Sequence, residues 1–451
     1  MKSTIAALAA LAGSAAAWSG HMRKEDLPEL NTANRMGTLR QIKLSQRDAA
    51  RAAGLYDAGR YRSAAGTPCS GNGTAGEDSC RSVDLAAHLT HEDMGSSERE
   101  GNDIWGWTSD DGREFALVGQ TDGTAFVEVL DGSLAYLGRL PTQTASSTWR
   151  DIKVIAGHAY IGSEASGHGI QVFDLGRLLD VDPSSPVEFS VDGDLAALFD
   201  GVGSSHNVVA NADTSTLYVV GAAECSGGLV VVDVSDPTAP EQVGCGASDG
   251  YVHDAQCVVY PEAGVDEAYR GREVCFAYNE DAFTIYDVSD RASPVVVSST
   301  PYDGASYTHQ GWVVDAEFRH VLLDDELDET YGSDQRTRTY IFDISSLEAP
   351  VHTGTFVAAH NSIDHNMYVV DGLAYQANYG SGLRILDVAG VAEDPTGGSI
   401  EELGYFDCYP EDDADPAAEF YGSWSVYPYF ASGTLIVNCI ERGLFAVKFT
   451  G

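Results

Sequence analysis

The chain has 451 residues and a formal net charge of −42, with 68 acidic against 26 basic side chains. A protein this acidic is not expected to bind nucleic acid or anionic membranes, because both are polyanions. Cationic partners and divalent metals remain, and the alternative is that the charge serves solubility alone. The basic side chains are unevenly spread, since residues 18–66 hold nine Lys/Arg and only five Asp/Glu.

The first 17 residues predict a signal peptide. Lys2 precedes a short apolar stretch, and Ala15 to Ala17 offer a small-residue cleavage site. The alternative is a buried N-terminal helix of the mature protein. No later segment is long and apolar enough to span a bilayer. We therefore expect a secreted, monomeric protein whose partner is an extracellular ligand or protein.

Residues 18–66 predict a basic N-terminal extension, as one or two helices or a disordered arm. Arg23-Lys24 could be a processing site that makes part of this segment a propeptide. The alternative is an ordinary extension packed against the main domain. Residues 67–96 are expected to form a disulfide-held loop segment, and Asn72 lies in the chain's single glycosylation sequon.

From residue 97 onward, short β-branched runs separated by Gly, Asp and Pro predict strands. One phrase recurs at 229–240, 283–294 and 339–350, and more loosely from Leu383. Its Asp residues lie 54, 56 and 44 positions apart and can each cap a turn. They are Asp233, Asp287, Asp343 and Asp387. A β repeat of this length is typical of a propeller blade, so we predict an all-β fold with a β-propeller over 97–451.

Seven repeat units predict a seven-bladed propeller, with six or eight blades as alternatives. The units begin near Asp103, Trp149, His206, His253, His309, His365 and Trp424. The last unit is short, which fits a ring that is closed by a strand from the start of the chain. The absence of a 3.6-residue period after residue 95 argues against a helical domain.

Eight cysteines, an even number, suit an oxidising compartment. Their order suggests sequential pairing, and the last three bridges would each close within one repeat. The proposed pairs are Cys69–Cys80, Cys225–Cys245, Cys257–Cys275 and Cys408–Cys439. No Cys-x-x-Cys pattern favours a metal site instead.

Four histidines begin four consecutive repeats, so a propeller would bring them together around its channel. They are His206, His253, His309 and His365, with Asp254, Gln256, Gln310 and Asp364 beside them. Imidazoles with nearby carboxylates suit Zn, Fe, Mn or Cu, and a metal there could activate water. The alternative is structural, with each His bonded to an Asp or a loop backbone of a neighbouring blade.

Two further features could bind ligands. The acidic run 322–329 could hold Ca²⁺, but it lacks the spacing of an EF-hand loop and is more typical of a solvated loop. Trp105, Trp107, Trp312 and Trp424 could rim the channel and stack against sugars or aromatic ligands, although core packing is the commoner role.

Several of these motifs together resemble the LVIVD-repeat proteins. The chain is similar in particular to the "choice-of-anchor B" group and its secreted fungal relatives, some of them described as regulatory P domain-containing. The matching motifs lie at 228–240, 253–257, 308–312, 322–329, 364–366 and 376–387. The resemblance covers about 97–449 and implies an extracellular β-propeller. It implies no activity and no catalytic residues, and the chain ends without the hydrophobic tail of anchored members.

The sequence leaves three functional hypotheses. The first is a secreted, non-enzymatic propeller that binds a ligand or an extracellular protein. The second is a metal-dependent hydrolase or lyase that acts through the four histidines. The third is a wall- or matrix-associated structural protein attached through the basic extension.

Overall fold

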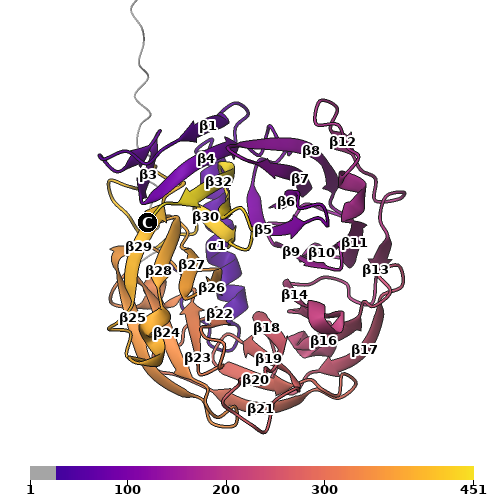
Figure 1. Ribbon diagram of the computed structural model, residues 1–451, viewed down its shortest axis with the longest axis vertical. Helices are drawn as coiled ribbons and strands as arrows, with labels where there is room; N and C mark the ends of the chain where they lie inside the picture. The colour runs from indigo at the N-terminus through magenta and orange to yellow at the C-terminus, as the bar shows by residue number, and fades with distance from the viewer. Residues whose placement is uncertain (1–26) are drawn as a thin grey trace, which may run out of the picture.

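The computed structural model describes residues 27–451, whose strands form seven sheets arranged in a ring (Figure 1). The first strands of successive blades contact one another and line the central channel. The fold is therefore a seven-bladed β-propeller, and all seven predicted unit starts coincide with these inner strands to within two residues. The proposed signal peptide and Arg23-Lys24 lie outside the described residues.

The blades follow one another in chain order, each antiparallel from the channel outward. Blades 1 to 3 comprise β5 (Gly101–Thr108), β6 (Glu114–Gln120), β7 (Gly123–Leu130) and β8 (Ser133–Pro141); β9 (Arg150–Ile155), β10 (His158–Ser163), β11 (Ile170–Asp174) and β13 (Ala197–Phe199); and β14 (Asn207–Asn211), β15 (Thr216–Val220), β16 (Leu229–Asp233) and β17 (Glu241–Gly246). Blades 4 and 5 comprise β18 (Asp254–Val259), β19 (Glu273–Tyr278), β20 (Phe283–Asp287) and β21 (Val295–Thr300); and β22 (Thr308–Val313), β23 (His320–Asp325), β24 (Arg336–Asp343) and β25 (Val351–Asn361).

The last two blades recruit strands from the start of the described chain. Blade 6 comprises β26 (Met367–Val370), β27 (Leu373–Ala377), β28 (Leu383–Asp387) and β29 (Glu401–Phe406), extended by β3 (Asp78–Arg81) and β2 (Thr74–Ala75). Blade 7 comprises β30 (Ser423–Tyr427), β31 (Thr434–Cys439), β32 (Gly443–Phe449) and β4 (Val83–Leu89), with β1 (Ala64–Thr67) outside. The pairing of β4 with β32 closes the ring, as the short final unit predicted. Strands of the propeller therefore lie within 67–96, where the sequence suggested a loop segment.

The remaining elements are short apart from one helix. They are α1 (Arg35–Ala52), α2 (Asp328–Tyr331), the two-residue strand β12 (Val187–Glu188) beside β8, and 3-10 helices at Leu175–Leu178, Ala212–Thr214, Glu224–Gly227 and Ala389–Ala392. No helix within 27–451 is long and apolar enough to cross a membrane.

Central strands are buried on both faces because each sheet packs between two others. Every residue of β15 is buried, and only the terminal Asp233 of β16 is partly exposed. That Asp caps the next turn by accepting the Ser235 backbone N–H at 2.9 Å. The other three repeat aspartates accept equivalent N–H groups at 2.8 to 3.0 Å. The turn-capping role predicted for these residues is confirmed.

The four sequential disulfides are all present. Cys225–Cys245 and Cys257–Cys275 each close within one blade, as expected. Cys408–Cys439 does not, because Cys408 follows β29 of blade 6 whereas Cys439 ends β31 of blade 7. The prediction that this bridge closes within one repeat was wrong, and the bond instead joins the last two blades.

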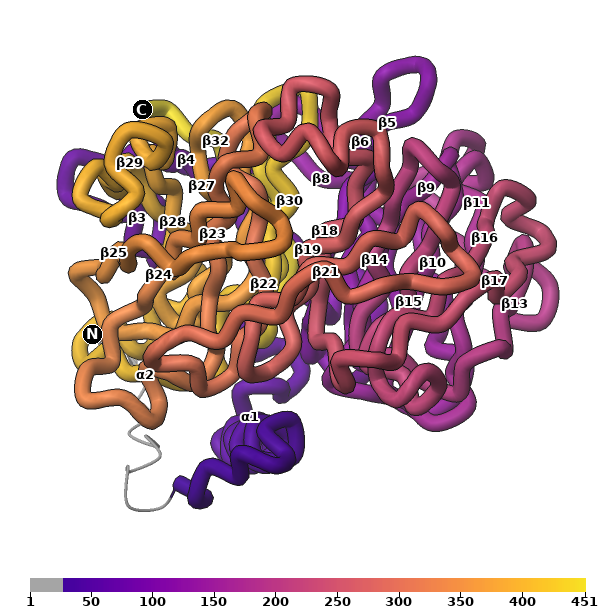
Figure 2. Tube along the Cα trace, turned by 90° about the horizontal axis from the view of Figure 1, so that it is seen from below, coloured from indigo at the N-terminus to yellow at the C-terminus, as the bar shows by residue number. Residues whose placement is uncertain are grey.

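The 18-residue helix α1 lies across one end of the channel (Figures 1 and 2). Asn34 caps its first turn by accepting the Gly37 N–H at 3.0 Å, and Gly54 takes the left-handed conformation just after its end. Met36, Leu39 and Ile42 are buried against the propeller. Within the segment 18–66, residues 35–52 thus form a helix that packs against the propeller.

Candidate functional site: two ends of one channel

Charge complementarity seats α1 on the propeller. Its basic side chains pair with carboxylates from four different blades. These carboxylates lie at the rim of the propeller that α1 covers. The pairs are Arg35–Asp281, Arg40–Glu164, Lys43–Glu326, Arg47–Glu100 and Arg51–Glu100. Arg47 and Glu100 are fully buried, with Arg47 Nε 3.3 Å from Glu100 Oε1. The basic character of the extension is therefore used in packing against the acidic propeller.

Beneath α1 the four predicted histidines stand side by side. Ring centroids are 4.2 Å apart between His206 and His253, 4.2 Å between His253 and His309, and 4.3 Å between His309 and His365. All four are at most 4 % exposed. The convergence inferred from their equivalent repeat positions is thus present in the structure.

The Nδ1 atoms of these rings are held by neighbouring groups. His253 Nδ1 lies 2.9 Å from the His309 carbonyl oxygen, and His365 Nδ1 lies 2.5 Å from that of Trp424. A carbonyl oxygen can only accept, so these Nδ1 atoms carry the proton and the Nε2 atoms of the neutral rings keep a free lone pair. His309 Nδ1 similarly lies 3.1 Å from Asp324 Oδ1.

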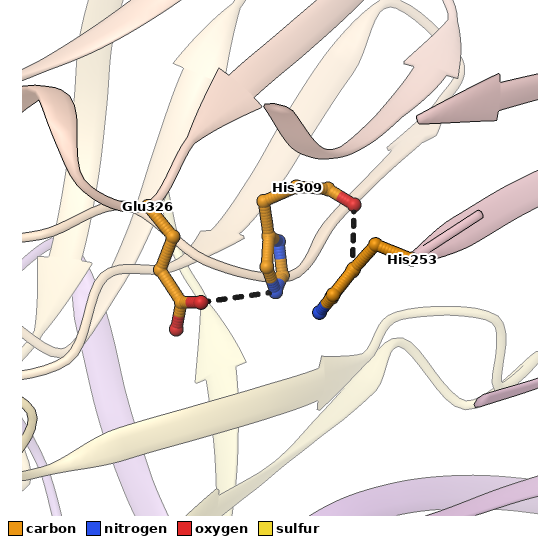
Figure 3. A group of neighbouring side chains, drawn as sticks. All are labelled: His253, His309 and Glu326. Atoms are coloured by element: carbon orange, nitrogen blue, oxygen red, sulfur yellow. Dashed lines mark hydrogen bonds and ion pairs between the residues drawn. The ribbon is translucent and has the colours of Figure 1, made fainter. Parts of the chain in front are cut away.

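Glu326 brings a carboxylate to the same point. One imidazole nitrogen from each of His253 and His309 and one carboxylate oxygen of Glu326 lie within 4.8 Å of one another (Figure 3). His365 Nε2 is 3.4 Å from Glu326 Oε1, which also accepts the Tyr379 hydroxyl at 2.5 Å. Two imidazoles and a carboxylate are a donor set suited to a divalent transition metal.

Lys43 of α1 places an ammonium group among these donors. Its Nζ lies 2.5 Å from Glu326 Oε1, and it also lies over the rings of Trp424 at 4.9 Å and Phe420 at 5.2 Å. Burial lowers the pKa of Lys43, against the opposing effect of Glu326. Burial likewise lowers the pKa values of His253, His309 and His365, which keeps these rings neutral near pH 7.

The other end of the channel holds a cavity of about 330 Å³. The inner strands start near α1 and run away from it, so residues later in each strand reach this end. Aromatic side chains form much of its wall: Trp105, Trp312, Tyr368, Tyr427 and Tyr429. Tyr368 meets Trp105 and Trp312 edge to face, with centroids 5.6 and 5.0 Å apart. Trp105 and Trp312 therefore line the channel at this end.

Polar groups line the floor of this cavity, among them Lys153, Asp254, Gln256 and Gln310. Lys153 Nζ lies 2.7 Å from Asp151 and 4.7 Å from the Trp105 ring centroid. Burial, reinforced by Asp151, raises the pKa of Asp254 to about 7. Gln256 and Gln310 each use their carbonyl oxygen to accept a backbone N–H of the next inner strand.

The predicted site residues thus divide between two places. The histidines lie under α1, whereas Asp254, Gln256 and Gln310 line the cavity. Asp364 does not line the cavity. Burial, together with the charges of Asp324 and Asp328, raises the pKa of its carboxyl. Trp424 belongs to the closed end, and Trp107 stacks on Phe115 away from both.

The acidic run 322–329 corrects one expectation. It was interpreted as a solvated loop, yet all of its residues are buried. Asp325 shows why, since its two oxygens accept the Tyr302 hydroxyl and the backbone N–H groups of Ser306 and Tyr307. The run is therefore an internal support, and its Glu326 is part of the closed end.

Sequence reasoning missed Lys43, Arg47 and the carboxylates Glu100 and Glu164. The signal available in the sequence was the contrast in charge between the basic segment 18–66 and the acidic rest of the chain. A basic helix in so acidic a protein is expected to pack against carboxylates. The rim carboxylates follow no fixed spacing, so their positions could not be read from the repeats.

The fold and its two channel ends define a seven-bladed β-propeller closed on one side by a helix. A protein-family model described as LVIVD repeat matches residues 218–245 and 273–301 of the sequence. These residues form the outer three strands of blades 3 and 4. The chain thus carries LVIVD repeats within a seven-bladed β-propeller, in agreement with the resemblance of its motifs.

Solved structures also align with the chain. The computationally designed Ika8 protein aligns with a TM-score of 0.45 at 10 % identity, over 81 % of this chain and 86 % of that one. A functionally unknown protein from Desulfotomaculum acetoxidans DSM 771 aligns with a TM-score of 0.45 at 8 % identity, over 67 % and 88 %. No curated protein matches the sequence.

Proposed function

We propose that the protein is a secreted binding platform whose ligand, a neutral saccharide, occupies the aromatic cavity at the open end of the channel. The observation that carries the proposal is the wall of five aromatic side chains around a floor of carboxyl and amide groups. The cavity volume of about 330 Å³ falls within the range of small-molecule sites. Four disulfides support a secreted protein.

The chemistry of the cavity favours a neutral sugar over other small ligands. Aromatic faces pack against the C–H faces of a sugar ring, while Asp254 and Gln256 can bond its hydroxyls. Lys153 is already paired with Asp103 and Asp151, so it offers no spare positive charge to an anion. A cationic ligand would find the Lys153 ammonium already placed against the face of Trp105, 4.7 Å from the ring centroid. A neutral polar ring avoids both penalties.

The alternative of a metal-dependent hydrolase or lyase has the His253, His309 and Glu326 donor group in its favour. Substrate access opposes it, because Lys43 and Arg47 bury this group beneath α1 with 1 % and 0 % of their own surface exposed. The open cavity is therefore the better place for a ligand.

Calorimetric titration with neutral mono- and disaccharides tests the proposal. We expect Trp312→Ala to weaken binding about tenfold or more, because it removes an aromatic wall. Trp107→Ala is the matched control, since Trp107 lies outside the cavity. Absence of binding across the panel, or equal losses in both variants, would refute a saccharide site at this end.

A further inference from the structure

At the closed end, several buried imidazole nitrogens and carboxylate oxygens present lone pairs. Too few N–H and O–H groups point at these atoms to give each of them a hydrogen bond. His253 Nε2 and Glu326 Oε2 are buried and have no hydrogen-bond partner. His309 Nε2 lies 3.8 Å from Glu326 Oε2, and His365 Nε2 lies 3.4 Å from Glu326 Oε1. Since the Nδ1 proton of His253 and of His365 is given to a backbone carbonyl, their Nε2 atoms cannot donate to this carboxylate.

Lone pairs that face one another in a buried site are stabilised by a cation. In this structure the cation is the Lys43 ammonium, which bonds one oxygen of Glu326. It leaves the other oxygen and His253 Nε2 without a partner. Lysine therefore satisfies only part of a donor set that has room for more bonds.

We propose that His253, His309 and Glu326 form a binding site for a divalent transition metal, with Lys43 of α1 as the internal cation that competes with the metal. Two imidazoles and one carboxylate suit Zn²⁺, Mn²⁺ or Fe²⁺ and leave coordination positions open. His365 Nε2 is the next donor in reach. The Nδ1 contacts to the His309 carbonyl and to Asp324 are the outer bonds that fix imidazole ligands. This inference is independent of saccharide binding at the other end.

Removal of one charge tests the competition. We expect full-length Lys43→Met to bind about one equivalent of Co²⁺, detected by its visible absorption, at least about tenfold more tightly than the wild-type chain, because a unit charge a few ångström from the ion is lost. Lys43→Arg keeps the charge and is the matched control, with expected affinity no higher than wild type. Lys43→Met/His309→Ala should lose the tight site.

Several outcomes would overturn the proposal. They are equal Co²⁺ affinity in wild type and Lys43→Met, or tight binding that survives His309→Ala. If Lys43→Met does not fold, Lys43→Gln serves in its place, because its amide can still donate to Glu326. If both neutral variants unfold while Lys43→Arg folds, Lys43 is a structural cation and the site is not a metal site. Saccharide binding measured on the same samples separates this failure from failure of the open-end proposal.

Discussion

The two ends of the channel are built from the same inner strands but are completed differently. At the closed end, the starts of the strands bring histidines together, and a helix from another part of the chain supplies the missing positive charges. At the open end, later residues of the same strands form an aromatic cavity that nothing within 27–451 fills. Repeat symmetry thus builds a channel, and the character of each end depends on residues outside the repeated phrase.

The comparison implies that charges at the closed end are essential for stability, which Arg47→Met tests most severely. We expect the free energy of unfolding to fall by about 3–5 kcal/mol, because the variant leaves the buried Glu100 carboxylate without this partner. Urea denaturation measures it.

The matched control for Arg47→Met is Arg35→Met on the same helix. Its partner Asp281 is 60 % exposed, so the expected loss is below about 1 kcal/mol. Similar losses for the two variants would show that burial of the ion pair does not distinguish the sites.

The contribution of a tyrosine hydroxyl to the free energy of unfolding should also differ between the two ends. Tyr379→Phe removes the bond to buried Glu326, and we expect a loss of about 1–3 kcal/mol in the free energy of unfolding. Tyr429→Phe at the open end, where Tyr429 is 37 % exposed, should cost less than about 0.5 kcal/mol. Thermal unfolding of both variants provides the measurement, and a larger loss for Tyr429→Phe would reverse the comparison.

A pH dependence of stability is also expected at the closed end. Burial raises the pKa of Glu441 to about 7, with Arg47 opposing it. A carboxyl whose pKa is higher in the folded state stabilises the fold at low pH, and this contribution is lost as pH rises from about 4.5 to 7. Relative to Glu441→Gln, the wild-type chain should therefore lose about 1 kcal/mol per pH unit between pH 5 and 7.

Urea denaturation at several pH values checks the Glu441 slope. Glu401→Gln, at an exposed position of β29, is the control and should run parallel to wild type. A wild-type curve that also runs parallel to Glu441→Gln would contradict the assignment.

The sequence predicted the blades well because each carries its own local signal. The Asp-capped turns, the seven inner strands and the sequential cysteines are all visible within single repeats or between neighbours. The convergence of the four histidines followed from their equivalent positions.

The division of the site could not be predicted in the same way. His253 and Gln256 are three residues apart, but a strand advances about 3.3 Å per residue, which carries Gln256 to the open-end cavity. The place of Lys43 depends on packing between segments nearly 300 residues apart, for which the repeat pattern holds no information.

The closure of the ring through β4 has a consequence for α1. Only eleven residues, 53–63, separate the end of the helix from β1, which is paired to β4 in the last blade. A helix that lifts off its seat remains tethered at a millimolar effective concentration. A competing basic peptide in solution would have to overcome that concentration, whereas one cut in the tether would abolish it. The occupancy of the closed end by α1 therefore depends on an intact linker at 53–63.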